Sequence, residues 1–173
     1  KQINPVLSRL LSSRNVEANN FEDYMNPKIK NILPDPFILH DMEIATNKIV
    51  EIIKEKKKIG IFGDYDVDGS TSTALLSKYL REAGVEFEFY IPDRIKEGYG
   101  PNEDAFTRLV DSNCELIITL DCGTTAFKEI DFTNKKGVDV IVIDHHKQGK
   151  ELPKAFAIVN PNKQSDNSNL VNL

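Results

Sequence analysis

Acidic side chains and a histidine pair follow three apolar runs of this chain, each at the point where the run ends. The first run leads into Gly63-Asp64-Tyr65-Asp66-Val67-Asp68-Gly69, the second into Asp121-Cys122-Gly123, and the third into Asp144-His145-His146. If these runs are strands of one parallel sheet, they deliver their polar groups to the same edge. Crowded carboxylates are unfavourable unless cations neutralise them. The pattern therefore predicts a divalent metal site, which we interpret as catalytic.

The donor atoms at this predicted site are carboxylate oxygens joined by imidazole nitrogen. Such a set suits Mn²⁺ or Mg²⁺ better than a structural zinc ion, which prefers thiolates and imidazoles. Two such ions about 3.5–4 Å apart would clamp a phosphoryl group. Asp121 stands alone at the end of the middle run, so it is the natural carboxylate to bridge two ions.

Each of these residues also has a simpler explanation when it is taken alone. A single Asp after a strand commonly forms a turn or caps a helix, and two adjacent histidines can pack on a surface. Asp64 to Gly69 also matches the opening of an EF-hand calcium loop, but Leu75 stands where the bidentate Glu belongs. Only the combination of acids and histidines at three strand ends favours the metal site.

The loop after a further strand-like run, at about 86–91, carries Arg94 and the segment Gly98-Tyr99-Gly100. A guanidinium at this place could bind a phosphate through two parallel hydrogen bonds. A solvated loop arginine fits the same spacing equally well.

Strand-like and helical segments alternate regularly from residue 58 onward. The predicted strands cover about 58–63, 86–91, 116–121, 139–143 and 156–160, and the predicted helices 41–56, 70–83, 102–112 and 124–136. We expect Asp41 to cap the first of these helices and the hydroxyls of Ser70 to Thr73 to cap the second. This alternation predicts an α/β fold, a parallel five-stranded sheet flanked by helices, with an N-terminal helical lead-in that starts at Asn4-Pro5.

The predicted organisation has three parts: an extension over 1–40, the sheet domain over 41–162, and a polar linker or start of a further segment over 163–173. The chain has 173 residues, of which 40% are hydrophobic, enough for one domain with a core. It has two cysteines, no signal peptide and no apolar stretch of the roughly 18–20 residues that a membrane span needs. These features predict a cytoplasmic protein. Because the first residue is not Met, we expect a fragment or a processed chain.

The formal net charge of −5 weighs against a simple electrostatic nucleic-acid binder, whose affinity comes from Lys and Arg. It weighs less against an enzyme whose metal ions bring their own positive charge.

The three acidic motifs resemble the first three motifs of the DHH phosphoesterase superfamily, and within it the RecJ-type exonucleases specific for single-stranded DNA. Three further stretches resemble that branch, and the resemblance runs from about residue 30 to 162. These stretches are Leu33-Pro34-Asp35-Pro36 with Asp41-Met42, Ile91-Pro92-Asp93-Arg94 with Glu97-Gly98-Tyr99-Gly100, and Val159-Asn160-Pro161-Asn162.

The resemblance implies a monomeric Mn²⁺- or Mg²⁺-dependent enzyme with two ions, which removes nucleotides from the 5′ end of single-stranded DNA during recombination and repair. Repair and single-strand-binding proteins are its implied partners, and no membrane is involved. The implied metal ligands are Asp66, Asp68, Asp121 and His145. Among the implied catalytic residues, Asp144 orients the histidines, His146 stabilises charge at the scissile phosphate, and Asp64 lies near the metals. The implied substrate-binding residues are Arg94, Gly98 and Tyr99, of which Arg94 would bind the 5′ phosphate.

The chain departs from the family pattern in two respects. Phe62 stands where many relatives carry a His, and no aspartate of a fourth motif follows His146. We therefore expect this segment alone to bind metal weakly and to be poorly active. Two alternatives stay open: a phosphodiesterase for oligoribonucleotides or cyclic dinucleotides, and a non-catalytic DHH-fold scaffold for DNA. A receiver-like phosphoacceptor domain does not explain His145-His146.

Overall fold

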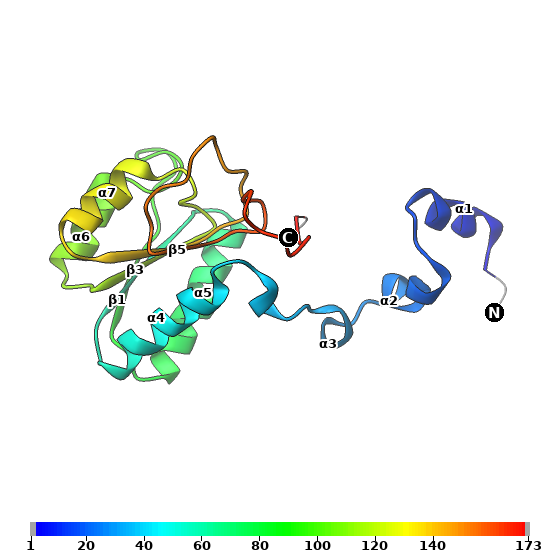
Figure 1. Ribbon diagram of the computed structural model, residues 1–173, viewed down its shortest axis with the longest axis horizontal. Coiled ribbons are helices and arrows are strands. Elements are labelled where there is room, and N and C mark those ends of the chain that lie inside the picture. The colour runs from blue at the N-terminus through cyan, green and yellow to red at the C-terminus, as the bar shows by residue number, and fades with distance from the viewer. Residues whose placement is uncertain (1–2, 172–173) are drawn as a thin grey trace. The chain divides into compact units, whose positions relative to one another are not determined.

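The computed structural model describes residues 3–171, so the outermost residues of the predicted parts 1–40 and 163–173 lie outside the described residues (Figure 1). The chain divides into two compact units, Lys1–Asp35 and Pro36–Leu173. Among the described residues, none of the helices is long and apolar enough to cross a bilayer.

The first unit is helical, as predicted for the lead-in. It contains α1 (Pro5–Ser13), a 3-10 turn η1 (Ala18–Asn20), α2 (Phe21–Met25) and α3 (Ile29–Ile32). The α1 helix begins where expected, because the Asn4 side chain accepts a hydrogen bond from the Val6 amide and Pro5 occupies the first helical position.

The second unit contains the predicted five-stranded sheet, and all strands run parallel. The strands are β1 (Ile59–Gly63), β2 (Phe87–Tyr90), β3 (Leu116–Leu120), β4 (Asp139–Ile143) and β5 (Ala157–Val159). They lie in the order β2-β1-β3-β4-β5. The three central strands are mostly apolar because both of their faces are covered.

Helices cover both faces of this sheet (Figure 1). A short turn η2 (Pro36–Ile38) leads into α4 (Met42–Lys54), which lies on the same face as α5 (Val67–Glu82), while α6 (Glu103–Asp111) and α7 (Phe127–Lys135) lie on the other. Alternate residues of each strand serve the two cores: Ile59 and Ile61 pack toward α4 and α5, whereas Phe62 packs with Phe106 of α6. Burying side chains of this size contributes roughly 2 kcal/mol each.

The start of α5 differs from the prediction by three residues. The helix begins at Val67, not at residue 70, because the Asp66 carboxylate accepts a hydrogen bond from the Gly69 amide at 3.0 Å and caps it. The hydroxyls expected to cap instead bond one turn back, Thr71 to the Val67 carbonyl and Ser72 to that of Asp68. Asp66 is therefore fixed at the helix N-terminus.

Two glycines let α5 pack directly against the end of β1. A Cβ atom on Gly63 would lie 1.9 Å from the Thr73 hydroxyl oxygen, and one on Gly69 would lie 2.3 Å from the Asp64 carbonyl oxygen. The second contact is with backbone, which cannot rotate away. The close packing sets the distance between Asp64 at the strand end and Asp66 at the helix cap.

Asp41 occupies the N-cap position of α4, but its carboxylate makes no capping hydrogen bond and its backbone is left-handed, with φ of 68°. The carboxylate instead pairs with the buried ammonium of Lys163 at 2.6 Å and accepts the Ile158 amide at 3.2 Å. Burial favours a higher pKa for Asp41, yet the hydrogen bonds and charge from Lys163, with the Ile158 amide and His40, outweigh it and lower the pKa below 3.8. This pair joins the start of α4 to the loop after β5.

We predict that Lys163→Met lowers the free energy of unfolding by on the order of 3 kcal/mol, because it leaves the half-buried Asp41 carboxylate without its cation. Since the Asp41 pKa is lowered, the contribution of the pair is complete above about pH 4 and is lost as the pH falls through the lowered value. Urea unfolding of the wild type and Lys163→Met at pH 7 and pH 3 measures this loss of free energy of unfolding. Lys135→Met, which breaks an exposed pair with Asp131 of the same 2.6 Å length, should cost below about 1 kcal/mol; equal losses would contradict the prediction.

We predict that Gly69→Ala destabilises the chain by about 1–3 kcal/mol, because the new methyl group forces the α5 backbone away from Asp64. Gly149→Ala is the matched control, since no atom lies within 4 Å of its added Cβ. Thermal unfolding of both variants measures the difference, and similar melting temperatures would refute the close approach.

Candidate metal centre

Three buried aspartates lie side by side at the carboxyl edge of the sheet. Asp64, Asp121 and Asp144 follow β1, β3 and β4, and their exposed fractions are 2%, 9% and 6%. The strand ladder continues through them, because the amides of Asp64, Asp121 and Asp144 donate to the carbonyls of Leu120, Ile143 and Val159 at 3.2, 2.9 and 3.0 Å. The sheet itself therefore sets the spacing of these acids.

Two clusters of potential ligands share Asp121. Asp64, Asp66 and Asp121 form one, and Asp121, His145 and His146 form the other; within each, one ligand atom per residue lies within 4.8 Å of the others. This sharing is the geometry expected of a carboxylate between two cations. The structure thus brings together five of the predicted site residues, with Asp64 and His146 among the potential ligands.

Asp144 fixes the histidine pair. Its Oδ1 atom accepts hydrogen bonds from the His145 amide at 2.7 Å, the His146 amide at 3.0 Å and His146 Nδ1 at 2.7 Å. Its Oδ2 atom accepts the amide of Thr124, a residue not predicted to matter, at 3.0 Å. Burial opposes the charged form of Asp144, but these bonds prevail and lower its pKa. The carboxylate thus stays charged and binds His146 Nδ1, while Nε2 of the same ring lies 3.2 Å from the Tyr99 hydroxyl oxygen.

The shared aspartate carries a perturbed pKa. Burial raises the pKa of Asp121 to about 6, and the hydrogen bond and negative charge of Asp66 add to the effect. His145 Nε2 lies 3.1 Å from Asp121 Oδ1. Burial also raises the pKa of Asp64, whereas the Gly69 amide lowers that of Asp66. A divalent cation between these carboxylates would relieve their repulsion.

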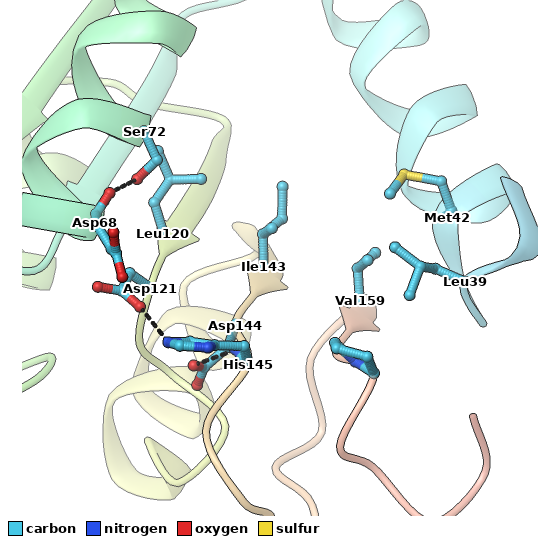
Figure 2. Close-up of a pocket in the computed structure, with 11 residues that line it drawn as sticks. Leu39, Met42, Asp68, Ser72, Leu120, Asp121, Ile143, Asp144, His145 and Val159 are labelled. Atoms are coloured by element: carbon cyan, nitrogen blue, oxygen red, sulfur yellow. Dashed lines mark hydrogen bonds and ion pairs between the residues drawn. The ribbon is translucent and has the colours of Figure 1, made fainter. Parts of the chain in front are cut away.

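Asp68 belongs to neither cluster among the described residues. It lies in the first turn of α5 and, with Asp121 and His145, borders a cavity of about 400 Å³ whose remaining wall is largely apolar (Figure 2). That wall includes Leu39, Met42, Leu120, Ile143 and Val159.

The loop after β2 reaches the histidines. The Tyr99 hydroxyl lies 3.2 Å from the His146 ring nitrogens, and its ring meets Tyr65 edge-on at 6.4 Å. The Arg94 guanidinium lies 5.3 Å from the centre of the Tyr65 ring, while Gly98 takes a left-handed φ of 83°. Burial, with the nearby charges of Asp144 and Asp64, raises the pKa of Tyr99, so its hydroxyl stays protonated at neutral pH. The motif spacing alone predicts no role for Tyr65, although an aromatic residue between two strand-end acids is a signal that could have identified it.

The donor set fits Mn²⁺ or Mg²⁺: three carboxylates and two imidazoles, without a thiolate. Cys122 adjoins Asp121 but is buried, donates to the Leu120 carbonyl, and has a thiol pKa raised by burial. It therefore packs as a small apolar side chain, and the oxygen-rich set is the one available to a cation.

Comparison with known proteins agrees with this geometry. Residues 58–170 match the DHH family, N-terminal domain. The chain is 41% identical over 160 residues to the single-stranded-DNA-specific exonuclease RecJ of Bacillus subtilis strain 168, covering 92% of this chain and 20% of that protein. It is 32% identical over 167 residues to the protein of the same name from Escherichia coli K12, covering 96% and 28%.

Solved structures give a consistent result. A crystal structure of exonuclease RecJ bound to manganese matches with a TM-score of 0.69 and 35% identity, over 75% of this chain and 33% of that one. RecJ from Thermus thermophilus in complex with Mn²⁺ matches with a TM-score of 0.61 and 32% identity, over 71% and 17%. This chain thus spans 20% and 28% of the length of the two curated relatives described above.

We predict that Asp121→Asn stabilises the metal-free chain at pH 7 and abolishes stabilisation by Mn²⁺. Because the Asp121 pKa is raised to about 6, protonated Asp121 contributes its full stability to the fold below about pH 4. This contribution is lost as the pH rises through about 6. Removing the charge should raise the melting temperature in EDTA at pH 7 by roughly 2–4 °C, with no gain at pH 4. Excess Mn²⁺ should stabilise the wild type alone. Asp131→Asn, at an exposed acid of α7, is the control; a lower melting temperature for Asp121→Asn in EDTA at pH 7 would contradict the account.

Proposed function

Because this chain belongs to the DHH family, we propose that the protein containing it is a metal-dependent exonuclease that degrades single-stranded DNA from the 5′ end. The observation that carries the proposal is the position of Asp121, shared by two ligand clusters at the strand ends. The relatives described above are named as single-stranded-DNA-specific exonucleases. Two similar solved structures are of RecJ proteins with bound manganese.

In this proposal two Mn²⁺ or Mg²⁺ ions would be held by the residues of the two clusters that share Asp121, which are Asp64, Asp66, Asp121, His145 and His146. The ions would polarise the scissile phosphodiester and lower the pKa of the attacking water. Asp144 keeps the His146 ring in one orientation through Nδ1. The family resemblance adds Asp68 as a ligand, and its place on the cavity wall is compatible with that role.

The loop after β2 supplies the substrate contacts of the proposal. Arg94 would bind the 5′ phosphate, for which a planar guanidinium is suited. Tyr99, beside His146, offers a protonated hydroxyl to a phosphate oxygen and an aromatic ring to a base. The left-handed backbone at Gly98 allows the loop to turn toward the histidines.

The remaining expectations also stay proposals. The enzyme would act in the cytoplasm as a monomer in DNA recombination and repair, with repair and single-strand-binding proteins as partners. Since the relatives are several times longer than this chain, we expect the isolated segment to be poorly active. The phosphate-binding surface that an acidic segment lacks would then come from the rest of the protein.

The test is digestion of a 5′-phosphorylated single-stranded oligonucleotide by the full-length protein in Mn²⁺. Asp121→Ala should lower the rate about a thousand-fold, equivalent to about 4 kcal/mol of transition-state stabilisation, while Asp131→Ala should match the wild type. Mononucleotides should appear from the 5′ end, and only with metal present. An oligonucleotide left intact by the wild type would reject the proposal, and short oligoribonucleotides and cyclic dinucleotides would be tested next.

A further inference from the structure

A loop outside the ligand clusters binds the backbone of the histidine pair. This loop, Asn160-Pro161-Asn162-Lys163, follows β5 directly, and Asn160 is fully buried. The Asn160 Nδ2 group donates to the His146 carbonyl at 2.9 Å and to the Thr124 hydroxyl at 2.9 Å. Its Oδ1 atom accepts the Asn162 amide at 2.7 Å. Both protons of the side-chain amide are thus used, one of them on the backbone of a candidate ligand.

Asn162 makes the same kind of contact with the other histidine, His145. Its Nδ2 group donates to the His145 carbonyl, so both histidine carbonyls are bound by asparagine side chains. The Asp144 carboxylate binds both histidine amides from the other side. The peptide planes on either side of each imidazole are therefore fixed, which limits the directions in which the two rings can point.

The loop is itself anchored. Lys163, which is 3% exposed, bonds to the Asp41 carboxylate at 2.6 Å and to the Ile158 carbonyl. Thr124 closes the network, because its hydroxyl accepts from Asn160 while its amide donates to Asp144 at 3.0 Å. A displacement of Asn160 would consequently reach His146 by two routes, through its own carbonyl and through Asp144.

The chemistry requires amides at these positions. A histidine carbonyl can only accept, so its partner must donate, and a carboxamide offers two donors and one acceptor on one rigid group. An aspartate of nearly the same shape would present oxygen to the carbonyls. We infer that Asn160 and Asn162 are positioning residues that aim His145 and His146 at the shared Asp121. The inference rests on the metal-dependent function proposed above.

The test compares Asn160→Asp with Asn134→Asp in the full-length protein. Asn134 makes the same kind of bond, from Nδ2 to the Lys154 carbonyl at 2.8 Å, but at the far end of α7. Calorimetric titration with Mn²⁺ should show affinity about 10- to 100-fold weaker for Asn160→Asp and unchanged for Asn134→Asp. An added carboxylate would by charge alone strengthen the binding of a divalent cation, so weaker binding reports lost orientation.

Kinetics separate positioning from a merely structural role. For Asn160→Asp we expect kcat on the oligonucleotide to fall by a similar factor, KM to stay within about twofold, and high Mn²⁺ to restore part of the rate. Should Asn160→Asp fail to fold, Asn162→Ala removes one donor without adding charge and should weaken Mn²⁺ binding in the same direction. Manganese affinity within twofold of wild type in the folded variant would overturn the inference, whatever happens to its melting temperature. If the wild type cleaves no DNA yet Asn160→Asp still binds Mn²⁺ more weakly, the positioning role stands and the exonuclease proposal fails.

Discussion

Repulsion among buried carboxylates is the constraint on which this structure depends. The ladder of β1, β3 and β4 places Asp64, Asp121 and Asp144 at one edge, where their negative charges cannot separate without breaking the sheet. Two apolar cores, one on each face, supply the stability that keeps the acids together. At neutral pH the metal-free fold thus carries an electrostatic cost, which a bound cation or protonation of Asp121 would remove.

The acids divide into two groups by the hydrogen bonds they receive. Asp66 accepts the Gly69 amide, and Asp144 accepts four donors, so in both the bonds favour the charged form. Asp64 and Asp121 are dominated by burial and have raised pKa values. The first pair therefore serves the local structure without a metal, since Asp66 caps α5 and Asp144 fixes the histidines. For Asp64 and Asp121, a bound cation is what would stabilise the charged form against burial.

The sequence predicted the features that depend on neighbouring residues. Apolar runs such as 116–120 identify central strands, and the residue after each run is then necessarily at the carboxyl edge. It could not predict contacts that depend on distant packing. Asp41 was expected to cap α4, but its partner Lys163 lies 122 positions away. Tyr99 meets His146 across 47 positions, a contact that depends on how the loop after β2 folds back. The early start of α5 has a local cause: Asp66, and not Ser70 or its neighbours, caps the N-terminus of the helix.

The strand order has a consequence for how such a site can change. Because β2 lies on one side of β1 and β3 on the other, the connections after β1 and β3 leave in opposite directions, to α5 on one face and α7 on the other. This is a topological switch point, where an open α/β sheet forms a crevice without removing any core side chain. Residues in the crevice can therefore be exchanged with little penalty to folding, so the same frame can accommodate different ligands while the interior stays constant.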